Sequence, residues 1–157
     1  MSTREQPWSD RPVDGRVVLL TRNPIAEAIE VIARTAGREV VVVEQDEEGR
    51  GVAAVQALAL RAGDAVVLCD HDAPDAPVLL RDALASPASY VAMMASRRRA
   101  EGLLPELEAE GVTGLDKLRV PAGLDIGGKA PGEMALSVVA EIVASSHGRG
   151  GGPMRNR

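Results

Sequence analysis

Short apolar runs alternate with amphipathic stretches along most of the chain. Each run has four or five residues and is rich in Val, Leu or Ala, which is typical of strands that are buried on both faces of a parallel sheet. The runs predict four strands, at residues 17–20, 40–43, 65–68 and 90–94, and a further short element that reaches Arg119 and Val120.

The stretches between the strands carry apolar residues at helical spacing. Pro24 suits the first position of a helix, because its missing N–H would have no partner there. After the second strand, the charged residues 44–51 are expected to form a solvated loop, and a functional role is the less favoured alternative. A short helix is expected to follow at residues 52–60.

The second half of the chain has clearer helix signals. Asp75 is expected to cap a helix whose first residue is Pro77, and Ser96 to cap the next one. Pro105 removes an N–H inside that next helix, which predicts a kink or two short helices. The last helix is expected at residues 131–146, with Ala, Val and Ile facing inward.

This alternation of strands and helices predicts an α/β fold: a three-layer, doubly wound, mainly parallel sheet of the Rossmann-like type. A chain of 157 residues with 45% hydrophobic content suits a single domain. We expect that domain at residues 16–147. Residues 1–15 are expected to form a flexible arm, and the glycine-rich, basic residues 148–157 a disordered tail.

Composition excludes several classes of function. The net charge of -5 gives no reason to expect a nucleic-acid binder, because the basic residues are local. No apolar run approaches the ~20 residues of a membrane span, and no signal peptide is recognisable, so no membrane partner is expected. A single cysteine allows no internal disulfide and agrees with a cytoplasmic location.

The turn after the first strand is where a dinucleotide-binding fold places a glycine-rich fingerprint. Here the sequence is T-R-N-P-I-A, from Thr21 to Ala26. The side chains of Thr21 and Asn23 would crowd an approaching pyrophosphate, and Pro24 removes an amide donor. NAD(P) binding at this turn is therefore disfavoured.

A C-D-H-D cluster follows the third strand, at Cys69 to Asp72. Asp70, His71 and Asp72 could hold a metal or shuttle protons. A metal needs more ligands than these, and a loop histidine held by hydrogen bonds is the alternative. We therefore predict no metal site, and Cys69 is expected in the core.

Ser96, Arg97, Arg98 and Arg99 follow the fourth strand. Cations at the start of a helix are opposed by its dipole. One interpretation is an anion site in which amide donors and guanidinium groups converge on a phosphate. The alternative is that the arginines pair with Asp70, Asp72 or Asp125, or point into solvent.

A glycine-rich loop precedes the last helix and contains Gly123, Leu124, Asp125, Ile126, Gly127, Gly128 and Lys129. The glycines permit positive φ and close backbone approach. Asp125 could accept from a ring N–H, and Lys129 could meet a phosphate. A turn that needs glycine for geometry alone explains the loop equally well. We expect the three polar segments to meet at one pocket, because each follows an apolar run in the same way.

Taken in order and spacing, three blocks resemble the XdhC/CoxI family: C-D-H-D-A-P-D-A-P, M-A-S-R-R-R and P-A-G-L-D-I-G-G-K-A-P-G-E-M-A-L-S-V-V-A-E-I-V. The resemblance is to the C-terminal Rossmann-type domain of these xanthine dehydrogenase and carbon monoxide dehydrogenase accessory proteins. It covers residues 17–146. Two motifs depart from the family pattern: T-R-N-P-I-A replaces G-A-G-H-V-A after the first strand, and A-P-G-E replaces T-P-E-E before the last helix.

The resemblance implies a cytoplasmic, chaperone-like maturation factor rather than an enzyme. Such a factor binds the molybdenum cofactor and helps to deliver its sulfurated form to a molybdenum hydroxylase, its client, with other maturation proteins or a second copy as further partners. The Ser96–Arg98 cluster and the loop from Gly123 to Gly127 would hold the pterin and its phosphate, with Asp70, His71 and Asp72 nearby.

Two other functional classes compete with this expectation. One is a small NAD(P)-dependent oxidoreductase with Asp70 or His71 as proton carrier, which lacks the glycine fingerprint. The other is a non-catalytic interaction subunit whose ligand site has degenerated.

Overall fold

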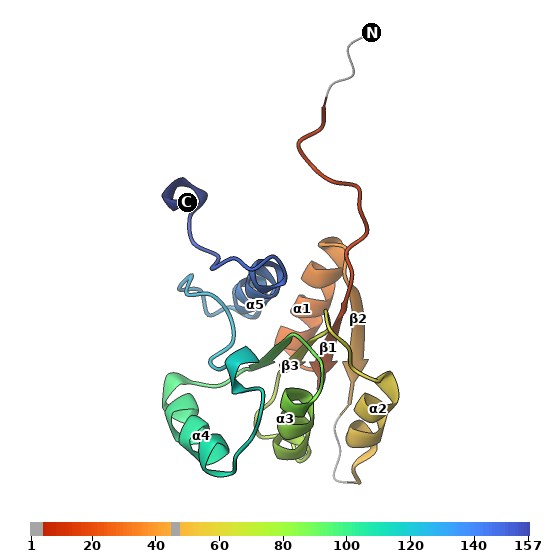
Figure 1. Cartoon of the computed structure of the whole chain (residues 1–157), viewed down its shortest axis with the longest axis vertical. Coiled ribbons are helices and arrows are strands. Elements are labelled where there is room, and N and C mark those ends of the chain that lie inside the picture. Colours follow the sequence, from red (N-terminus) through yellow and green to blue (C-terminus); the bar gives the residue numbers. More distant parts are fainter. Residues whose placement is uncertain (1–4, 45–47) are drawn as a thin grey trace.

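A single parallel sheet forms the centre of the computed structural model, which describes residues 5–44 and 48–157 (Figure 1). The strand order is β2-β1-β3-β4-β5, and every neighbouring pair is parallel. The strands are β1 (Arg16–Leu20), β2 (Glu39–Val43), β3 (Ala65–Leu68), β4 (Tyr90–Met93) and β5 (Leu118–Arg119).

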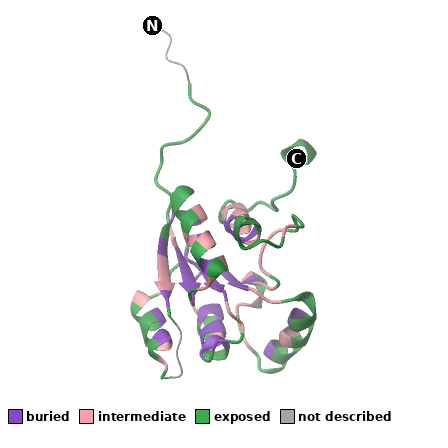
Figure 2. Cartoon of the chain, turned by 180° about the vertical axis from the view of Figure 1, so that it is seen from behind, coloured by how far each residue is buried: buried purple, intermediate pink, exposed green. Residues whose placement is uncertain are grey.

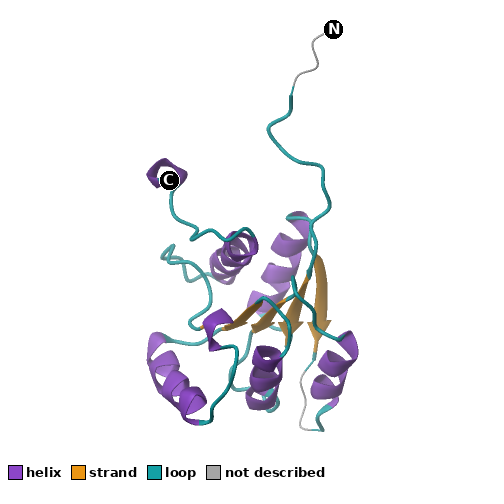
Figure 3. Cartoon of the chain, viewed as in Figure 1, coloured by secondary structure: helices purple, strands orange, loops and turns teal. Residues whose placement is uncertain are grey.

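Helices cover both faces of the sheet (Figure 3). One face packs against α1 (Pro24–Thr35) and α5 (Pro131–Ser146), and the other against α2 (Arg50–Leu58), α3 (Ala76–Ala85) and α4 (Arg97–Ala109). The predicted three-layer, doubly wound α/β fold is thereby confirmed. No helix within the described residues is long and apolar enough to cross a lipid bilayer.

The core lies in two layers, because side chains along a strand alternate between the faces of the sheet. Val18 and Leu68 face α2, α3 and α4, whereas Val17 and Val67 face α1 and α5. Figure 2 shows the central strands as buried and the outer sides of the helices as exposed. Both faces are therefore apolar, which explains the uninterrupted Val and Leu runs in the sequence.

Pro105 does not divide the fourth helix, so of the two expected outcomes the pair of short helices is wrong and the kink stays a prediction. One α-helix runs from Arg97 to Ala109 with Pro105 inside it. The proline lacks the N–H that would bond to the Glu101 carbonyl. Ala100 and Leu107, on either side of the break, are both buried. Core packing on both sides of Pro105 thus keeps the helix continuous despite the lost hydrogen bond.

The start of α3 also differs from the prediction. Asp75 occupies the N-cap position, but its side chain accepts no capping hydrogen bond, and Ala76, not Pro77, is the first helical residue. The φ and ψ of Asp75, -87° and -5°, are already helical, whereas a capping residue is normally extended. Its carbonyl instead accepts the N–H of Leu79 at 2.9 Å.

Smaller boundary shifts occur elsewhere. α2 begins and ends two residues before the predicted range, and β4 ends at Met93 rather than at residue 94. The predicted loop at residues 44–51 falls partly on residues 45–47, which lie outside the described residues. Residues 5–15 and the residues that follow α5 lead away from the sheet (Figure 1), and the flexibility of the two predicted terminal segments remains a prediction.

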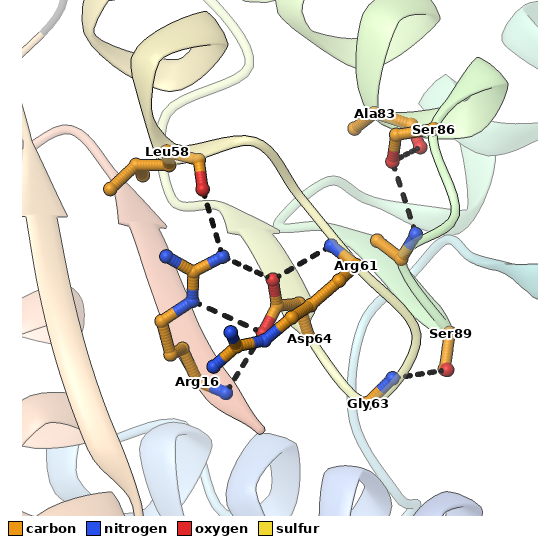
Figure 4. A network of polar contacts seen from close by, with 9 residues as sticks. Arg16, Leu58, Arg61, Gly63, Asp64, Ala83, Ser86 and Ser89 are labelled. Atoms are coloured by element: carbon orange, nitrogen blue, oxygen red, sulfur yellow. Dashed lines mark hydrogen bonds and ion pairs between the residues drawn. The ribbon is translucent and has the colours of Figure 1, made fainter.

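A buried ion pair joins the beginnings of β1 and β3 (Figure 4). The Asp64 carboxylate is fully buried and accepts from the backbone N–H, the Nε and the Nη2 of Arg16, at 3.1, 3.2 and 2.6 Å. The N–H of Arg61 donates to it at 3.0 Å. Burial, the largest influence, would raise the pKa of Asp64, but these hydrogen bonds together outweigh it and hold the pKa below its ordinary value.

Candidate functional site

The first polar turn lies where the strand order reverses, between β1 and β3. Asn23 caps α1, since its Oδ1 accepts the N–H of Ala26 at 2.8 Å, and its Nδ2 donates to the Cys69 carbonyl at 3.0 Å. Thr21 has a φ of 61°, the left-handed conformation that favours glycine. The Asn23 side chain therefore bridges the crevice in which this class of fold binds a pyrophosphate.

A cavity of about 670 Å³ opens instead between α3 and α4, beside the carboxyl ends of β3 and β4. Its apolar lining includes Leu80, Met93 and Leu103, and its polar lining includes His71, Ser96, Arg98 and Arg99. Two of the three predicted polar segments thus contribute to one cavity.

The arginines in this cavity follow the cap of α4. Ser96 Oγ accepts the N–H of Arg99 at 3.1 Å, which confirms the predicted N-cap. The Ser96 carbonyl takes the N–H of Ala100 at 3.0 Å. The amides of Arg97 and Arg98 have no partner within the helix, because they belong to its first turn. Neither amide donates a hydrogen bond to any residue that the structure describes, so the first turn of α4 offers two backbone donors.

Only one of the three arginines has a carboxylate partner among residues 5–44 and 48–157. Arg99 Nη2 lies 3.4 Å from Asp72 Oδ1, whereas no described carboxylate lies within ion-pair distance of Arg97 or Arg98. Of the alternative interpretation, pairing with an aspartate holds for Arg99 alone, with Asp72. Arg97 and Arg98 are exposed, and only Arg98 of these two lines the cavity.

His71 is held by its surroundings, in agreement with the alternative of a hydrogen-bonded loop histidine. Its Nδ1 lies 3.0 Å from the Met94 carbonyl, and because a carbonyl only accepts, Nδ1 carries a proton. Its Nε2 lies 3.5 Å from Asp72 Oδ2. Asp70 Oδ1 accepts the N–H of Asp72 at 2.9 Å. Within the part of the chain that the structure describes, no three His, Cys, Asp or Glu side chains are grouped as metal ligands.

Cys69 is buried on the α1 and α5 face of the sheet. Burial, and to a smaller extent the nearby Asp70, raises the pKa of Cys69 to about 12. The thiol is therefore protonated at neutral pH, so a role in sulfur transfer has no support in its environment.

The glycine loop turns to the other face of the sheet and packs on α5. The N–H of Gly123 donates to Glu141 Oε1 at 3.1 Å, and the Tyr90 hydroxyl donates to the same oxygen at 2.7 Å. The N–H of Leu124 bonds to the Ser137 carbonyl at 3.3 Å. Burial first, and then Glu141, raises the pKa of Tyr90, so its hydroxyl stays protonated and donates.

None of the loop residues Gly123, Leu124, Asp125, Ile126, Gly127 and Lys129 lines the cavity between α3 and α4. The expectation that three segments share one pocket is therefore corrected to two, and a binding role for the loop stays a prediction. Parallel strands bring their ends to one edge of the sheet, but the face to which a loop then turns depends on packing. The sequence patterns did not single out Tyr90 and Glu141. The available signal was Tyr90 itself, because the hydroxyl of a buried tyrosine usually has a hydrogen-bond partner.

Gly123 and Gly127 offer a test of this packing. Both have positive φ, at 100° and 84°, but an added Cβ would lie 2.4 Å from Ser137 Oγ at Gly123 and would meet nothing at Gly127. We expect Gly127→Ala to lower the free energy of unfolding by about 1–2 kcal/mol, the left-handed cost alone. Gly123→Ala should cost more, by a further 1–3 kcal/mol or so for overpacking. Urea unfolding measures both, and equal losses would show that the loop does not pack on α5.

Comparisons with known proteins agree with this fold. A family model described as the XdhC Rossmann domain matches residues 17–142. The uncharacterized protein YqeB of Escherichia coli K12 is 33% identical over 104 residues, which cover 65% of this chain and 19% of YqeB. A crystal structure described as a xanthine dehydrogenase from Bacillus halodurans has a TM-score of 0.71 at 20% identity, over 87% of this chain and 44% of its own. That structural likeness supports the fold, and the chain spans less than half of either relative.

Proposed function

Because the chain belongs to the XdhC Rossmann-domain family, we propose that it is an accessory factor of a molybdenum hydroxylase and binds the molybdenum cofactor between α3 and α4. Family membership agrees with the resemblance in the sequence. The proposal places the factor in the cytoplasm. Its single cysteine, Cys69, is free and buried, which agrees with a reducing compartment in which disulfides are rare. Its client would be a dehydrogenase of the xanthine or carbon monoxide type.

The observation that carries this proposal is the pair Arg97 and Arg98 at the N-terminus of α4, because neither side chain has a carboxylate partner among the described residues. An exposed cation in the first turn of a helix is unfavourable by about 0.3–1 kcal/mol, because it opposes the helix dipole. A bound phosphate would offset this cost, because it attracts both the guanidinium groups and the backbone N–H groups of the first turn. The arrangement favours an anionic ligand.

The rest of the cavity suits a ligand with a ring as well as a phosphate. Its volume of about 670 Å³ falls within the range of small-molecule sites, roughly 300–1,000 Å³. Leu80, Met93 and Leu103 provide apolar surface for a pterin. The cofactor would bring the molybdenum chemistry, and the chain would hold its phosphate and shield its ring from water.

Arg81 and Glu106, which also line the cavity, belong to an ion-pair network between α3 and α4. Arg81 Nη2 lies 2.5 Å from Glu110 Oε2 and 3.8 Å from Glu106 Oε1. These carboxylates neutralise Arg81, so the unbalanced positive charge remains at the α4 N-terminus. The phosphate is therefore expected at Arg98 and the ring toward Met93.

The experiment is retention of the cofactor by the purified protein. After incubation with molybdopterin and gel filtration, pterin fluorescence should elute with the protein. NADH and NADPH, titrated in parallel, should not bind at micromolar concentration, because Asn23 bridges the nucleotide crevice. Absence of retained pterin would contradict the proposal and favour a non-catalytic interaction subunit. Micromolar binding of NADH would contradict it and favour an oxidoreductase.

A further inference from the structure

The two edges of the sheet differ in what they expose. β5 is only two residues long, and short edge strands resist pairing with another chain. β2 has five residues, four of them valine. It forms the outermost strand on the side of α2 (Figure 3). The β2 edge is thus the better template for a further strand.

The backbone groups of Val40 and Val42 point outward from this edge. The N–H of Thr21 bonds to the Val43 carbonyl, so Val43 faces β1, and its alternate neighbours face away. Arg34 Nη2 covers the Val40 carbonyl at 3.4 Å. No hydrogen bond from any residue that the structure describes reaches the outward groups of Val42. Among residues 5–44 and 48–157, nothing therefore closes the edge at Val42.

A groove of about 530 Å³ runs beside the β2 edge, between β2 and α2, and its lining is mostly apolar but includes Glu44 and Arg50. Val41, Val43, Ala54 and Leu58 line it. An added strand would therefore gain side-chain contacts as well as backbone hydrogen bonds, as in recognition by β-augmentation.

We propose that the β2 edge pairs antiparallel with β2 of a second copy of this chain and joins the two sheets. Two-fold symmetry around Val42 makes the outward groups of the two Val42 residues exchange their hydrogen bonds. In this register Val41 lies opposite Val43 of the second copy, above the groove. Val40 lies opposite Glu44 of the second copy.

Charge complementarity identifies the occupant as a second copy. Arg34 covers Val40, so it would meet Glu44 of the other copy, and the symmetry creates two such pairs. Both side chains are accessible, with 59% of Arg34 and 65% of Glu44 exposed. Within one chain, Arg34 already contacts Glu30 at 3.3 Å and Glu44 contacts Arg22 at 3.6 Å. The interface therefore extends an existing row of alternating charges.

This surface is separate from the proposed cofactor site. α2 and α4 lie at opposite ends of their layer (Figure 1), so pairing through β2 leaves the cavity between α3 and α4 open. Dimerisation does not depend on the cofactor, and either proposal can fail alone.

Charge reversal tests the dimer by sedimentation velocity across a concentration series. The wild type should dimerise at micromolar concentration. Arg34→Glu and Glu44→Arg should each weaken the dimer at least about tenfold, because like charges would face each other twice. The double variant, Arg34→Glu with Glu44→Arg, should recover the wild-type constant within about threefold. Glu27→Arg, an equal charge change on an exposed position of α1, should have no effect.

Circular dichroism and thermal unfolding verify that each variant is folded, which is expected for exposed positions. A monomeric wild type at 100 µM or so would overturn the proposal. So would single variants that dimerise like the wild type, or a double variant that stays monomeric. A monomeric wild type that captures an extended valine-rich peptide would instead make β2 a docking strand for another protein.

Discussion

Replacing Asp64 with alanine should lower the free energy of unfolding by about 3–5 kcal/mol, the loss typical of breaking one side of a buried ion pair. The Asp64 side chain is fully buried and that of Arg16 is only 13% exposed. Without the carboxylate, the Arg16 guanidinium keeps one hydrogen bond to the described part of the chain, to the Leu58 carbonyl at 3.1 Å. The N–H of Arg61 also loses its acceptor. Guanidinium chloride unfolding measures the change.

Asp82→Ala provides the matched control, because Asp82 is an exposed aspartate on α3. It should change the free energy of unfolding by no more than about 0.5 kcal/mol. Similar losses in both variants would mean that the Arg16–Asp64 pair does not hold β1 and β3 together.

Lowering the pH should remove the stabilisation that the Arg16–Asp64 ion pair provides. The folded-state pKa of Asp64 lies below its value in the unfolded chain, so the unfolded chain takes up the proton first. The stabilisation is therefore complete above the unfolded pKa of about 3.9 and is lost as the pH falls through the folded pKa. The difference in stability between the wild type and Asp64→Ala should shrink over that interval.

The strands were predictable because both faces of the sheet are apolar. Val66 and Val67 point to opposite faces yet are both fully buried. A parallel sheet covered by helices needs such a continuous run, which stands out in the sequence. The last helix was predicted with its observed bounds, Pro131–Ser146, because Pro131 and the following apolar spacing mark its start.

Tertiary contacts decided what the sequence could not. Local chemistry at Pro105 predicts a break, but the burial of Ala100 and Leu107 overrides it. Motif order placed the glycine loop beside the arginines, whereas Glu141 anchors Gly123 on α5. That contact joins residues 18 positions apart in the chain, so no local sequence pattern predicts it.

At the arginine cluster the structure leaves both interpretations open, an anion site or arginines that point into solvent, and a binding role stays a prediction. Three consecutive cations after Ser96 contradict the preference of a helix start, and the structure leaves Arg97 and Arg98 without carboxylate partners among its described residues. A violation of a local rule without local compensation is a common mark of a ligand site.

Alanine at both Arg97 and Arg98 should weaken binding of molybdopterin at least about tenfold. A hydrogen bond to a charged group contributes about 1.5–3 kcal/mol, and each 1.4 kcal/mol is tenfold in affinity. The fold should be unaffected, because both side chains are exposed and neither has an ion-pair partner among the described residues. Arg155→Ala with Arg157→Ala removes the same charge from the exposed tail and serves as the control.

Binding of the cofactor beside α4 is tested most directly by titrating molybdopterin fluorescence against the wild type and these two double variants. We predict tight binding by the wild type and the tail variant, within about twofold of each other, since charge far from the site is largely screened by salt. The Arg97 and Arg98 variant should bind at least about tenfold more weakly. Equal affinities for all three proteins would contradict a phosphate site at the N-terminus of α4.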